Sequence, residues 1–109
     1  MPHYLFQVAY TPQAWAGMIK NPQDRMEAIK PVIAKMGGTI EAGYLAFGDY
    51  DLVVIVQMPG NVDAAAFSLA ATAGGALRAV KTTPLLTTAE GLEAMKKAGA
   101  SGYTPPKGT

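Results

Sequence analysis

The sequence contains no cysteine, a single histidine and few charged residues for its length. The lack of cysteine excludes disulfide bonds, a thiol nucleophile and a thiolate metal site. One histidine excludes a metal site built from several histidines of one chain, and we expect neither a metal nor a cofactor. The nine basic residues are scattered, with only Lys96 and Lys97 adjacent. The basic patch typical of nucleic-acid-binding proteins is therefore missing, and we expect no nucleic-acid partner.

Long apolar runs are also missing. Near the N-terminus, Gln7 and the Thr11-Pro12 turn interrupt the apolar residues, so the pattern predicts neither a membrane-spanning helix nor a signal peptide. The 109 residues are half apolar and carry a formal charge of +1, which predicts one compact soluble domain over residues 1–98. Residues 99–109 are small and polar and contain proline, which is typical of a flexible tail. We expect a cytoplasmic protein with no membrane partner.

The most apolar stretch, Leu52–Met58, predicts a buried central strand. It is rich in β-branched residues, too short for a typical helix, and stopped by Pro59-Gly60. The turn Gly48-Asp49-Tyr50-Asp51 precedes it and joins it to Thr39–Phe47, so the two stretches are expected to form an antiparallel hairpin. Both faces of the central strand are apolar at its middle, which implies a second buried surface.

The N-terminal stretch His3–Tyr10 alternates and predicts a further strand. Its bulkier set, which includes Tyr4 and Phe6, is expected to face the helices, leaving His3 and Gln7 on the opposite side. Thr11-Pro12 is a cap followed by a proline at the first helical position, and Asn21-Pro22 repeats this device for a second helix.

The second of these helices is also indicated by the spacing of its apolar residues. Met26, Ile29, Ile33 and Met36 recur at helical spacing and predict a stripe that faces the core. Pro31 lies within this stretch and is expected to kink or divide the helix.

In the second half of the chain, Asn61 is expected to cap an alanine-rich helix that ends near Ala73. A fourth strand is predicted over Ala76–Leu86. Thr87 and Glu90 have the spacing of a capping box and predict the start of a last helix.

The order β, α, β, β, α, β, α predicts an α+β protein, a ferredoxin-like βαββαβ sandwich with an extra C-terminal helix. Helices would cover one face of the four-stranded antiparallel sheet. The other face would carry Leu5, Val53 and Ile55, an apolar patch that a monomer rarely exposes. We therefore expect this face to be covered by a second copy of the chain, in a homodimer or higher homo-oligomer.

The run from Phe47 to Pro59, with its Gly-Asp-Tyr-Asp turn, resembles the GYD domain family of small bacterial proteins. Tyr10-Thr11-Pro12-Gln13 and the alanine-rich helix ending in glycine extend the resemblance over about residues 4 to 90. The resemblance implies a dimeric α+β barrel in which two ferredoxin-like sheets face each other. Most members of the family have no assigned activity. The sequence departs from the family pattern in the fourth strand, around Gly74–Lys81.

Alternation and charge select the polar residues that can reach the expected barrel side, and these are the candidate ligand-binding residues. They are His3, Gln7, Tyr44, Asp51 and Arg78. The turn position of Asp51 favours bonds to its own backbone, with a place at the barrel rim as the alternative, and Arg78 is the candidate anion contact. Pro2 offers a remote resemblance to the tautomerase family, in which an N-terminal proline is a general base.

Three functions remain open from the sequence. The first is a homo-oligomeric small-molecule-binding module, because a barrel of two sheets is a ready pocket and no set of catalytic residues is visible. The second is a cofactor-independent enzyme, monooxygenase-like or proton-transferring, that acts on an aromatic or quinone-like molecule. The third is a structural or interaction subunit without a ligand. The fold alone does not choose among them.

Overall fold

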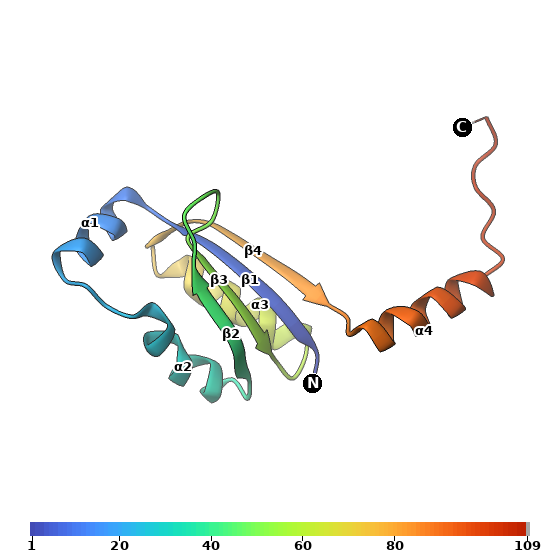
Figure 1. Ribbon diagram of the computed structural model, residues 1–109, viewed down its shortest axis with the longest axis horizontal. Helices are drawn as coiled ribbons and strands as arrows, with labels where there is room; N and C mark the ends of the chain where they lie inside the picture. The colour runs from blue at the N-terminus through green and yellow to red at the C-terminus, as the bar shows by residue number, and fades with distance from the viewer. Residues whose placement is uncertain (109) are drawn as a thin grey trace.

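Four strands form one antiparallel sheet in the order β2-β3-β1-β4 in the computed structural model, which describes residues 1–108 (Figure 1). The strands are β1 (His3–Tyr10), β2 (Thr39–Leu45), β3 (Leu52–Gln57) and β4 (Leu77–Leu85). The helices are α1 (Pro12–Lys20), α2 (Arg25–Lys35), α3 (Asn61–Ala73) and α4 (Thr88–Gly99). The predicted α+β, ferredoxin-like fold with an extra C-terminal helix is confirmed, with strand ends displaced by one or two residues.

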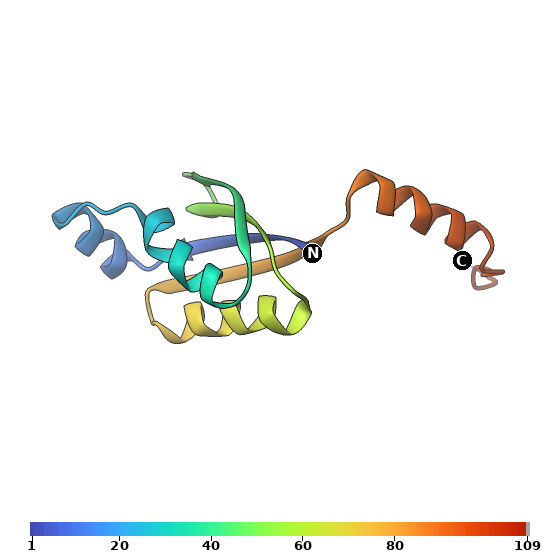
Figure 2. The same ribbon diagram turned by 90° about the horizontal axis from the view of Figure 1, so that it is seen from below.

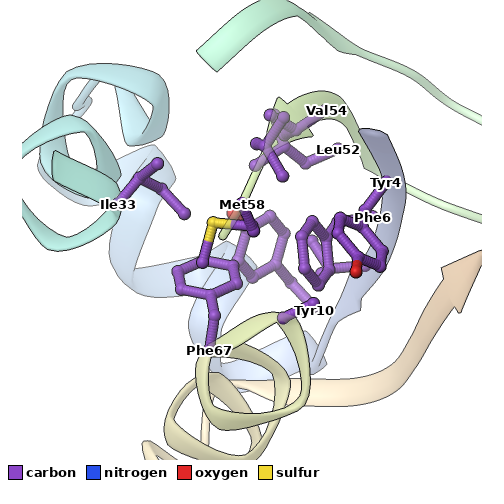
Figure 3. Close-up of a cluster of buried hydrophobic side chains, with 11 residues drawn as sticks. Tyr4, Phe6, Tyr10, Ile33, Leu52, Val54, Met58 and Phe67 are labelled. Carbon is purple, nitrogen blue, oxygen red and sulfur yellow. The ribbon is translucent and has the colours of Figure 1, made fainter. Parts of the chain in front are cut away.

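One face of the sheet, which we call the covered face, packs against the helices. In Figure 2, α3 runs beneath β1 and β4, and α2 packs against β2. The alternating residues predicted for the core are buried there, and the close-up in Figure 3 shows them converging on Phe67 of α3 and Ile33 of α2. The strand residues of this core are Tyr4, Phe6, Val8, Tyr10, Leu52, Val54 and Val56, followed by Met58. Alternation thus assigns the two faces of β3 and of most of β1 correctly, whereas Ala9, near the end of β1, is buried although it alternates with the core set.

Helix α2 starts later than the sequence indicates. Asp24 is its N-cap, and its Oδ1 accepts hydrogen bonds from the backbone N–H groups of Met26 and Glu27. Asn21, the expected cap, is instead the C-cap of α1. A carboxylate that accepts two helix N–H groups and also favours the positive helix end outcompetes the amide. Pro31 lies inside α2 and does not divide it.

Helix α3 also departs from the expected cap. Gly60 occupies the N-cap position and makes no side-chain hydrogen bond there. Asn61 is the first helical residue, and its Oδ1 accepts a hydrogen bond of 2.6 Å from the Tyr4 hydroxyl. The expected cap therefore satisfies a core tyrosine, because a buried phenol needs a partner.

The C-terminal helix α4 extends away from the sheet beyond β4 (Figures 1 and 2). The predicted capping box is present: the Glu90 N–H donates to the Thr87 hydroxyl, and the Thr87 N–H donates to the Glu90 carboxylate. Leu92 and Met95, two large apolar side chains of this helix, are exposed.

The last described residues follow α4 without a further regular element, and Tyr103 is exposed. The predicted tail begins at residue 99, which is the last residue of α4, and its final residue, Thr109, lies outside the described residues. A flexible tail remains a prediction. Within residues 1–108, no helix is both long and apolar enough to cross a membrane.

Candidate functional site

The second face of the sheet, which we call the open face, carries the predicted apolar patch. Strand register places Leu5 opposite Ile55, and Gln7 opposite Val53. On the other side of β1, Leu5 lies opposite Thr83, and Gln7 lies opposite Lys81. These apolar side chains remain partly accessible, in contrast to the core of the covered face. The open face is therefore an apolar centre flanked by polar groups.

A histidine–carboxylate pair crosses the open face. Nδ1 of His3 on β1 hydrogen-bonds Oε1 of Glu41 on β2, and because β3 lies between these strands, the pair bridges over β3. The side chains of His3 and Glu41 are 27% and 33% exposed. A register shift between Ile40 and Ala42 positions Glu41 for this contact.

The hydrogen bond to Glu41 determines which nitrogen of the His3 ring is available to a bound molecule. When Nδ1 donates its proton to the Glu41 carboxylate, Nε2 keeps a free lone pair. That nitrogen can accept a hydrogen bond or a proton from a bound molecule, and the carboxylate stabilises the imidazolium that would form. The pair can therefore support ligand binding or proton transfer.

Two further predicted residues flank the same region. Tyr44 lies opposite Val53 on β2 and is 72% exposed, whereas Gln7 lies opposite Val53 on β1 and is partly buried. They therefore share one row across the sheet. Lys81 extends that row on β4, opposite Gln7. The sequence pattern indicates Arg78 as the basic residue of this face, whereas the strand register places Lys81 there.

Arg78 makes a different contact. Its Nη2 donates to the backbone oxygen of Asp49 at 3.3 Å, which ties β4 to the loop between β2 and β3. The register of β4 shifts opposite Ala9 and Tyr10, next to Arg78. This irregularity removes the simple alternation on which its assignment to the barrel side depended.

Asp51 serves the fold and is not presented to the open face. It is 8% exposed, and its Oδ2 accepts hydrogen bonds from the Tyr10 backbone N–H at 2.8 Å and from Trp15 Nε1 at 3.2 Å. It thus joins β3 to the end of β1 and to α1. A carboxylate that accepts from two such donors is already satisfied, so these contacts agree with a structural role for Asp51 better than with a place at the barrel rim.

The structure therefore brings His3, Gln7 and Tyr44 to one face and adds Glu41 and Lys81 to them. Within residues 1–108, histidine and carboxylate side chains nowhere gather in the groups of three or more that can hold a metal ion.

Comparison with protein families finds a match to the GYD domain. The model of the GYD domain matches residues 4–95, which include the sheet except for His3, the first residue of β1, and the first two thirds of α4. No curated protein and no solved structure matches the chain.

Proposed function

Because this chain belongs to the GYD domain family over residues 4–95, we propose that it is a homo-oligomeric small-molecule-binding module that uses the open face of its sheet. The observation that carries the proposal is the His3–Glu41 pair, which lies across an apolar face. Placing these two polar groups beside apolar side chains costs folding stability, because both groups lose part of their hydration there. A binding role for the pair would account for its presence on this face.

The apolar centre supports pairing with a second copy of the chain. Leu5, Val53 and Ile55 lie on adjacent strands and form a continuous patch. Two such faces related by a two-fold axis would be self-complementary and would form the dimeric α+β barrel. The polar residues at the edges of the patch would then line the space between the sheets.

The ligand class follows from the mixture of groups on this face. Leu5 and Ile55 offer flat apolar contact suited to a ring, whereas His3, Gln7 and Lys81 offer hydrogen bonds to oxygen atoms. An aromatic or quinone-like molecule that carries hydroxyl or carbonyl groups satisfies both requirements.

A second candidate is a cofactor-independent enzyme that moves a proton on such a molecule. The His3–Glu41 hydrogen bond favours it, because a carboxylate that orients an imidazole is a common arrangement for a general base. Deuterium exchange at a carbon of a bound molecule, followed by NMR, would separate the two candidates. An exchange rate that falls in Glu41→Gln while affinity is kept would support the enzyme.

The experiment that tests the proposal combines a thermal-shift screen with sedimentation. We expect the wild type to be a dimer at micromolar concentration and its melting midpoint to rise with a hydroxylated aromatic or a quinone. His3→Ala and Glu41→Gln should weaken this binding about tenfold. Glu93→Gln, on the exposed surface of α4, is the matched control and should bind as the wild type does.

Each contrary outcome has a definite meaning. A ligand that stabilises Glu41→Gln and the wild type equally, and whose rate of deuterium exchange is also equal in the two, would remove the pair from the site. A stable dimer that binds none of the molecules screened would favour a structural or interaction subunit. A stable monomer would contradict the assembly.

A further inference from the structure

A groove opens on the covered side of the sheet, between α2 and α3. Its volume is about 370 Å³, and its floor is formed by core residues of β1 and β3. It lies toward the N-terminal end of α2 and the C-terminal half of α3. Its lining is almost wholly apolar and includes Val8, Ile29, Val32, Val54, Phe67 and Ala71.

Residue size explains why the groove opens at this end. At the level of Phe67, the ring packs edge-on against Phe6, with centroids 5.1 Å apart, and fills the space above the sheet. One turn later α3 presents only Ala70 and Ala71, and then Gly74. These side chains are too short to reach α2, so the space stays open.

One positively charged side chain lines this groove. Arg25, the first residue of α2, lines it and is partly buried. Its Nη1 donates to Oε1 of Gln23 at 2.9 Å, and within residues 1–108 it forms no ion pair. A guanidinium carries five N–H donors, so most of its capacity remains available to an anion.

Tyr10 shares this end of the groove with Arg25. Burial raises the pKa of its hydroxyl, while the Arg25 guanidinium lowers it and the Asp51 carboxylate adds a smaller increase. The phenol therefore stays protonated at neutral pH and can donate a hydrogen bond.

Two carboxylates lie near this end of the groove, and both have hydrogen-bond partners. Asp51 accepts from the Tyr10 N–H and the Trp15 indole, and Asp24 caps α2. The unpaired charge at the groove is therefore the positive one on Arg25.

We propose that this groove binds an aliphatic monocarboxylate, with its carboxylate at Arg25 and the Tyr10 hydroxyl and its hydrocarbon chain between α2 and α3. The volume lies at the lower end of the range of small-molecule sites, which suits a chain of medium length. The charge of Arg25 selects an acid over a neutral amphiphile. This site is separate from the open face and does not depend on the function proposed there.

Calorimetry with decanoate, below its micelle concentration, tests the proposal. Decanol is the matched neutral probe, and acetate is the matched probe without a chain. We expect decanoate to bind at least about tenfold more tightly than either probe. The only tryptophan, Trp15, packs edge-on against Tyr10 with centroids 5.5 Å apart, so its fluorescence should also report decanoate binding.

Two pairs of variants locate the site. Arg25→Gln should weaken decanoate binding at least about tenfold, whereas Lys30→Gln, which removes an exposed charge elsewhere on α2, should not. Ala71→Leu should abolish binding by filling the groove, whereas Ala65→Leu, on the exposed side of α3, should not. Glu41→Gln, on the other face of the sheet, should bind as the wild type does.

Equal decanoate affinity in Arg25→Gln and Lys30→Gln would overturn the proposal, and so would equal affinity for decanol and decanoate. A fall in sedimenting mass on adding decanoate would also overturn it, because the groove would then be occupied by another copy of the chain. If Ala71→Leu fails to fold by circular dichroism, the Arg25 and Lys30 pair still decides the question.

Discussion

The two faces of strand β3 differ in how completely one chain buries them. On the covered face, Val54 and Val56 are 3% and 0% exposed. On the open face, Val53 and Ile55 from the same strand remain partly accessible. Burial of the first pair is completed by α2 and α3 of the same chain, whereas burial of the second pair needs something from outside. Stability of the monomer therefore depends chiefly on the covered face, whereas assembly and binding at the His3–Glu41 pair are proposed for the open face.

The largest effect that this comparison predicts is that of Val54→Asp. It places a carboxylate without a partner among the side chains of the core and should lower the free energy of unfolding by at least about 3 kcal/mol. Val53→Asp is the matched control one residue away, and it should dissociate the proposed dimer while leaving most of the monomer's stability intact. Urea unfolding and sedimentation velocity on both variants measure the two effects.

If the two variants lost stability and assembly to the same degree, the faces would not differ as proposed. If Val53→Asp changed neither property, the open face would be a solvated surface with no partner.

A second prediction concerns Asp51, which the structure assigns to the fold. Asp51→Ala removes the acceptor of the Tyr10 N–H and of the Trp15 indole, and should cost about 2 to 3 kcal/mol of unfolding free energy. Asp49→Ala, in the exposed loop nearby, should cost little, because Arg78 bonds its backbone oxygen and not its side chain. Urea denaturation of both variants tests this. A small loss in Asp51→Ala would return its carboxylate to the set of candidate ligand contacts.

The sequence predicts those parts of the fold that depend on local signals. Alternation in residues 3–8 and in Leu52–Gln57 assigns the two faces of the central strands, because the period of two is set by strand geometry. The capping box of Thr87 and Glu90 is likewise a matter of spacing alone. The order of elements then leaves few possible topologies.

The parts that could not be predicted depend on contacts between distant segments. Glu41 reaches His3 because the register of β2 shifts next to it, and no local sequence pattern predicts this shift. Asp51 bonds Trp15, which lies 36 residues earlier in the chain. The groove at Arg25 depends on how far α2 and α3 lie apart, and alanines in α3 suit close packing and an open groove equally well.

A third prediction concerns stability at alkaline pH. The pKa of Tyr10 is raised above its usual 10.0, chiefly by burial. The unfolded chain therefore loses this proton first as the pH rises, so the stability that Tyr10 contributes is present below about pH 10 and is lost as the pH passes through its folded-state pKa. Urea unfolding between about pH 8 and pH 11 should show a steeper loss in the wild type than in Tyr10→Phe. Parallel curves would show that the phenol ionises as easily in the fold as in water.

The smallest predicted effect is that of Thr82→Val, which tests whether the residues of one chain satisfy every buried group on the covered face. Thr82 lies opposite Phe6 on β4, and its hydroxyl is buried without a hydrogen-bond partner among the described residues. Thr82→Val keeps the shape and removes the unsatisfied group, so it should leave the free energy of unfolding unchanged or raise it by up to about 1 kcal/mol. Thr83 lies on the open face, and its hydroxyl is not a buried group without a partner. Thr83→Val should therefore not raise the free energy of unfolding in this way. If urea unfolding instead showed a clear loss in Thr82→Val, its hydroxyl would have a partner in solution, and the covered face would be completed by a group from outside the chain, as the open face is proposed to be.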